Sequence, residues 1–113
     1  MNLNDVVSIL HCTVRTGGDQ LKREVKGGYA GDLLSDVIAN SKAGDIWVTM
    51  QVHANIVAVA VLKELAGIVL VRGRQPVEDT VRRAAEENVA ILVSDLPAFE
   101  VVGKLYSMTG GGT

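Results

Sequence analysis

The sequence predicts an α/β fold of a single domain, with a mainly parallel sheet and flanking helices. Three apolar runs of strand length, residues 46–50, 67–71 and 89–93, are separated by segments long enough for a helix. Short continuous apolar runs are typical of strands buried on both faces, and a helix between two such strands makes a parallel βαβ unit. The 113 residues suit one domain with one core.

Local patterns predict the other elements. Apolar spacing of three and four residues indicates helices, proline is tolerated in a first helical turn, and glycine clusters indicate turns and loops. In chain order we expect a helix over residues 3–10, a strand over 11–15, a turn over 16–19, an extended stretch over 23–26, a loop over 27–31, a helix over 32–39, a helix from Pro76, and a closing helix over 98–108 with Phe99, Val102, Leu105 and Tyr106 inward. Residues 1–108 then form the domain, and residues 109–113 form a flexible glycine-rich tail.

The helix between the first two buried strands is the most apolar of the chain. Residues 56–62 are an unbroken apolar run, whereas a surface helix normally keeps a polar outer face. Either a neighbouring helix of the same chain covers this helix or a second subunit does. We expect a homodimer in which Ile56, Val57 and Ala60 form part of the contact.

Composition and charge exclude several classes of partner. The formal net charge of −2 does not favour nucleic acid, and an aromatic content of 4% offers no base-stacking platform. No apolar run is long enough to span a bilayer, and the first residues do not resemble a signal peptide. Cys12 is the single cysteine, which suits a reducing compartment. We expect a cytoplasmic protein that binds neither nucleic acid nor membrane.

The residues that usually carry catalysis form no recognisable constellation. His11 and Cys12 are adjacent, so on a strand they point to opposite faces, and His53 has no neighbouring metal ligand. The sequence has neither a phosphate-binding loop nor a serine nucleophile motif. We therefore expect no enzymatic activity, no cofactor and no metal.

Polar residues gather where the parallel strands are expected to end. Ligands of open α/β sheets bind beyond the carboxyl ends of the strands, and nearby helix starts add partial positive charge. These positions hold Gln51, His53, Arg72, Arg74 and Ser94. They predict a site for a small anion such as a phosphate or a carboxylate. The alternative is that the arginines are solvated loop charges and that His53 and Ser94 only cap helices.

Several short motifs, in their order and spacing, resemble the DRTGG domain over nearly the whole chain, from about residue 3 to residue 108. The motifs are Arg23-Glu24-Val25, Gly27-Gly28-Tyr29, Asp32-Leu33-Leu34-Ser35-Asp36, Gly44-Asp45 with Trp47-Val48-Thr49, Asn55-Ile56-Val57-Ala58-Val59-Ala60, Leu65-Ala66-Gly67-Ile68 with Gly73 and Pro76, and Ala98-Phe99-Glu100. The string Arg15-Thr16-Gly17-Gly18 mimics the family name but lies before the matching part, so we assign it no function.

The resemblance implies an α/β fold like the N-terminal domain of HPr kinase/phosphorylase, which is not the catalytic half of that enzyme. It also implies a regulatory and dimerising module, as in relatives joined to phosphotransacetylases or set between CBS domains in pyrophosphatases. Our first hypothesis is a non-catalytic regulatory module that forms a homodimer and serves a partner enzyme. The alternative is a domain that binds a small anionic or nucleotide effector.

Overall fold

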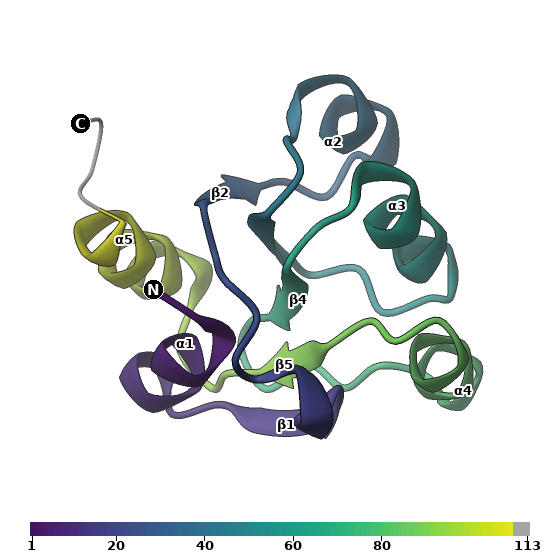
Figure 1. Cartoon of the computed structure of the whole chain (residues 1–113), viewed down its shortest axis with the longest axis horizontal. Coiled ribbons are helices and arrows are strands. Elements are labelled where there is room, and N and C mark those ends of the chain that lie inside the picture. The colour runs from purple at the N-terminus through teal and green to yellow at the C-terminus, as the bar shows by residue number, and fades with distance from the viewer. Residues whose placement is uncertain (110–113) are drawn as a thin grey trace.

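In the computed structural model, which describes residues 1–109, five strands form one sheet in the order β1-β5-β4-β3-β2 (Figure 1). The strands are β1 (Thr13–Thr16), β2 (Gly27–Ala30), β3 (Asp45–Thr49), β4 (Gly67–Leu70) and β5 (Ile91–Val93). Strands β2 to β5 run parallel, and β1 pairs antiparallel with β5. The predicted α/β class with a mainly parallel sheet is confirmed.

Five α-helices cover the two faces of this sheet. They are α1 (Leu3–Leu10), α2 (Leu34–Asn40), α3 (Asn55–Lys63), α4 (Glu78–Glu86) and α5 (Ala98–Met108), and a short 3-10 helix, η1 (Gly18–Gln20), follows β1. Helices α2, α3 and α4 lie on one face, and α1 and α5 lie on the other (Figure 1). Strands β3, β4 and β5 are therefore covered by helices on both faces, as their continuous apolar sequences predict.

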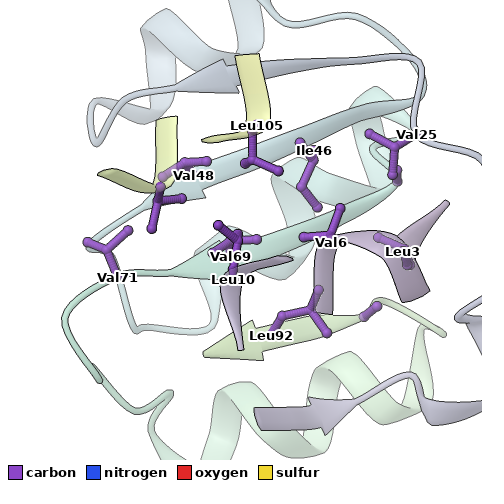
Figure 2. Close-up of a cluster of buried hydrophobic side chains, with 13 residues drawn as sticks. Leu3, Val6, Leu10, Val25, Ile46, Val48, Val69, Val71, Leu92 and Leu105 are labelled. Carbon is purple, nitrogen blue, oxygen red and sulfur yellow. The ribbon is translucent and has the colours of Figure 1, made fainter. Parts of the chain in front are cut away.

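Alternation along the strands divides the core into two halves. Ile46 and Val48 of β3 point toward α1 and α5, where they join a cluster that includes Leu3, Val6 and Leu105 (Figure 2). Trp47 lies between them in sequence and points to the opposite face, where it packs with side chains of α2 and α3. One strand thus supplies both halves of the core.

The glycine-rich segment that we predicted as a loop is in fact strand β2, so that prediction is wrong. Gly28 pairs with Ile46 of β3, and Tyr29 pairs with Trp47. Glycine has a low propensity for strands, but β2 lies at the sheet edge and follows the backbone of β3. The first strand also shifts from the predicted 11–15 to Thr13–Thr16, because His11 ends α1 in a left-handed conformation.

The closing helix α5 has the predicted bounds but a different buried face. Leu105 is buried as predicted, together with Val101, whereas Val102 is 38%, Tyr106 60% and Phe99 92% exposed. Both residue sets have helical spacing, so the sequence alone did not determine which one faces inward. The predicted tail lies outside the described residues except for Thr109, whose N–H donates to the Leu105 carbonyl at the end of α5.

Candidate functional site

The segments that follow the parallel strands meet at one edge of the sheet, because β2 to β5 all end there. Gln51 and His53 follow β3, Arg72 and Arg74 follow β4, and Ser94 follows β5. The topology therefore brings the five predicted ligand-binding residues to the same edge. The individual contacts decide which of them remain free to meet a ligand.

Gln51 is engaged in holding two of these segments together. Its side-chain amide donates to the carbonyl of Asp32 over 3.0 Å. The Asp32 carboxylate in turn accepts from the Thr49 hydroxyl at 2.8 Å and from the Met50 N–H at 2.7 Å. These bonds join the segment after β2 to the end of β3, so Gln51 has a structural task already.

Arg72 and Arg74 lie on a tight loop that is fixed to its neighbour by backbone hydrogen bonds. The N–H groups of Arg72 and Gly73 donate to the carbonyls of Leu96 and Ser94 at 2.9 and 2.8 Å. Arg72 and Gly73 both have positive φ, 54° and 65°, and a Cβ added at Gly73 would lie 2.8 Å from the Asp95 carboxylate. The loop therefore holds its two arginines in one backbone arrangement.

Both arginine side chains are exposed at this edge. The Nε of Arg74 donates to the Met50 carbonyl at 2.8 Å. The two terminal guanidinium nitrogens make no hydrogen bond within residues 1–109. Among residues 1–109, the ion pairs all lie on α4, so neither arginine has a carboxylate partner. A bidentate guanidinium without a partner is suited to an anionic group.

Ser94, which we predicted at this site, has its hydroxyl engaged inside the fold. Its side chain is fully buried. The hydroxyl donates to the Leu10 carbonyl at 3.0 Å and accepts from the Leu96 N–H at 3.2 Å. Ser94 thus satisfies the backbone of two connecting segments, and no ligand can reach it without breaking those bonds.

His53 is exposed just before α3, and its backbone carbonyl accepts from the Ile56 N–H. No side chain caps α3, and no acidic residue lies in its first turn. Helix α4 differs, because Glu78 and Asp79 already complement its positive end. Of the two predicted helix starts, only that of α3 is free of acidic side chains.

The three residues that we predicted at a dimer interface are buried by the chain itself. Ile56 is 0% exposed, Val57 2% and Ala60 2%, and they pack with side chains of the sheet on the α3 side. Their side chains pack inside the chain, although Val57 also lines the groove between α3 and α4, and their contact with a second copy stays a prediction. Seven consecutive apolar residues leave the inward face of the helix undetermined, and packing on the sheet decided it.

The outer face of α3 is apolar as well, although we did not predict Val61 and Leu62 as exposed residues. Val61 is 43% exposed and Leu62 is 66% exposed. Together with Val57 and Ala58 they line a groove of about 560 Å³ between α3 and α4, whose other wall carries Arg82, Arg83, Glu86 and Glu87. An exposed apolar helix face of this kind is a candidate association surface.

A second hollow, of about 100 Å³, lies between α5 and the edge strand β2. Gly28, Ala30, Ile46 and Val48 form its sheet side, and Val102 and Tyr106 border it on α5. No charged residue lines it. Its volume is that of a pocket for one small side chain rather than for a nucleotide.

The described residues contain no cluster of three or more histidine, cysteine, aspartate or glutamate side chains that could hold a metal ion. Within the same part of the chain, no helix has the length and apolar character needed to cross a membrane.

Cys12 is half-buried, and burial raises the pKa of its thiol from 9.0 to about 12. A thiol that stays protonated at neutral pH is a poor nucleophile, because the thiolate is the reactive form.

We predict that Cys12 of the folded chain reacts slowly with iodoacetamide. Since the thiolate fraction below the pKa falls tenfold per pH unit, alkylation near neutral pH should be roughly 1,000-fold slower than in the unfolded chain. The raised pKa also means that stability from this group is complete below pH 9.0 and is lost as the pH rises toward about 12. Mass spectrometry of the labelled protein, with the urea-unfolded chain as control, measures the rate; equal rates in the two samples would contradict the prediction.

The comparisons with known proteins agree with this architecture. The family model of the DRTGG domain matches residues 5–108. A solved structure of the CBS and DRTGG domains of the regulatory region of Clostridium perfringens pyrophosphatase, complexed with the activator diadenosine tetraphosphate, is similar with a TM-score of 0.73. At 13% identity this similarity shows the fold, and it covers 92% of this chain and 45% of the solved chain. No curated protein matches the sequence.

Proposed function

This chain belongs to the DRTGG domain family, and we propose that it is a non-catalytic regulatory module that self-associates as a homodimer. One observation carries the proposal: α3 buries one apolar face in the core and exposes a second one, formed by Val61 and Leu62. Apolar side chains gathered on an exposed helix face mark association surfaces. A regulatory role is supported by the similar structure, which is part of the regulatory region of an enzyme.

Size-exclusion chromatography with light scattering tests self-association. We expect a mass of twice the 12.0 kDa of one chain at micromolar concentration. The variant Leu62→Ser should shift toward the monomer mass, because it removes the most exposed aliphatic side chain of α3. Ile9→Ser, a change at a partly exposed residue of α1 outside the groove, is the control and should keep the wild-type mass. A monomeric wild-type chain at these concentrations would defeat the proposal.

We also propose a second candidate function, the binding of a small anionic or nucleotide effector at the carboxyl edge of the sheet. It is favoured by Arg72 and Arg74, two exposed guanidinium groups that lack a carboxylate partner among the described residues. His53 lies at the start of α3 on the neighbouring segment and adds a further donor. An effector bound here would contact the amino end of the same helix whose outer face is offered for association.

Thermal unfolding in the presence of inorganic phosphate, ATP or diadenosine tetraphosphate tests the second candidate. A ligand at a hundred times its Kd stabilises a folded chain by about 2.7 kcal/mol, which raises the melting temperature by several degrees. The double variant Arg72→Ala with Arg74→Ala should lose this shift, whereas Lys104→Ala on α5 should keep it. If none of the three compounds raises the melting temperature, the edge does not bind this class of ligand.

A further inference from the structure

The groove between α3 and α4 carries an ordered arrangement of charges beside its apolar wall. Arg82 and Arg83 lie on α4, Glu86 ends this helix about one turn later, and Glu87 is its C-cap residue. All four line the same groove as Val61 and Leu62, and α3 and α4 lie next to each other on one face of the sheet (Figure 1). An apolar strip bordered by charges is the usual composition of a protein interface.

Two of these charges are poorly matched within the chain. Arg82 pairs with Asp79 and with Glu86, the latter at 3.5 Å. Arg83 has only a distant contact of 3.9 Å to Asp79. Glu87 has no ion pair among the described residues. Arg83 and Glu87 are therefore the groove charges that are available to another molecule.

Their spacing is self-complementary. Arg83 and Glu87 are four residues apart, about 6 Å along the helix axis. A two-fold axis that crosses α4 midway between them places Arg83 of one copy opposite Glu87 of the other, and repeats the same pair in reverse. A two-fold contact needs such a patch, in which each residue meets its complement on an identical surface.

We infer that the α3–α4 groove is a two-fold interface with a second copy of this chain, in which Arg83 of each copy pairs with Glu87 of the other. This inference rests on the proposed self-association and assigns it a surface and an orientation. Val61 and Leu62 of both copies form the apolar part of the contact, and the two ion pairs fix the antiparallel alignment. The hollow between α5 and β2 has apolar side chains but no charged lining, so it offers no comparable register.

Charge-exchange variants test the pairing by sedimentation equilibrium at low salt, where ion pairs are least screened. Arg83→Glu alone places two like-charge contacts in each dimer, and so does Glu87→Arg alone; each should weaken the dimer roughly tenfold or more. An equimolar mixture of the two variants should recover a dimer, because both contacts then join opposite charges. The double variant Arg83→Glu with Glu87→Arg should also recover the wild-type Kd.

The controls separate this inference from the proposed function. Lys104→Glu on α5 makes the same charge change as Arg83→Glu outside the groove and should leave the Kd unchanged. Circular dichroism melts establish that each variant is folded. A wild-type chain that stays monomeric overturns both the self-association and this interface. A wild-type dimer whose Kd is unaffected by either single exchange, or that is instead lost in Phe99→Ser on α5, retains the self-association and overturns the α3–α4 interface.

Discussion

Replacing Trp47 by alanine should lower the free energy of unfolding by about 3–5 kcal/mol, the range measured for deleting a large aromatic side chain from a core. Trp47 is fully buried in β3 and is the largest buried side chain of the chain. It packs with Val37 of α2 and Ile56 of α3, so its removal leaves a cavity against two helices. Its indole N–H also donates to the Gly31 carbonyl at 2.8 Å, which would lose this partner.

Urea unfolding followed by circular dichroism measures this effect, since Trp47 is the only tryptophan and its fluorescence is lost with it. Trp47→Phe keeps most of the volume but not the hydrogen bond, and should cost about 1–2 kcal/mol. Tyr106→Ala on the exposed side of α5 should change stability by less than about 0.5 kcal/mol. A Trp47→Ala variant as stable as the wild type would contradict the packing of α2 and α3 on this face.

Gly17→Ala should be the next most damaging change, with a loss of roughly 2–5 kcal/mol. Gly17 has φ of 83°, a conformation that costs an L-residue roughly 1–2 kcal/mol. An added Cβ would also lie 2.6 Å from the Cα and Cβ of Ala90, and relieving such overpacking costs a further ~1–3 kcal/mol. The strain arises between η1 and the residue that precedes β5.

The neighbouring glycine provides a matched control for this prediction. A Cβ at Gly18 would have no atom within 4 Å, and its φ is not in the left-handed region. Gly18→Ala should therefore be neutral or stabilising by up to about 1 kcal/mol. Equal urea midpoints for the two alanine variants would show that Gly17 does not pack on Ala90 as described.

The sequence was sufficient to predict the buried strands and their helices, because continuous apolar runs of strand length have few other uses. It was insufficient for β2, whose Gly27 and Gly28 carry no strand signal and are ordered by pairing with β3. It also did not fix the orientation of α3 and α5. Both helices are apolar over more than one face, and contact with the sheet selects Ile56 and Val101 as inward residues.

The sequence predicted which edge of the sheet holds the candidate site, but not which side chains at that edge are free to meet a ligand. The rule that ligands bind beyond the carboxyl ends of parallel strands placed Arg72, Arg74 and His53 on one edge. Ser94 shares that edge, but its hydroxyl is consumed by the backbone of Leu10 and Leu96, which lie far apart from each other in the sequence. Long-range hydrogen bonds of this kind leave no local pattern, so only the fold reveals them.

We propose above all that a second copy of the chain covers the exposed apolar face of α3. Sedimentation equilibrium of the wild-type protein over a concentration series tests it most directly. We predict a reversible shift from one chain of 12.0 kDa to twice that mass as the concentration rises through the micromolar range. A single species of 12.0 kDa throughout the series would contradict it.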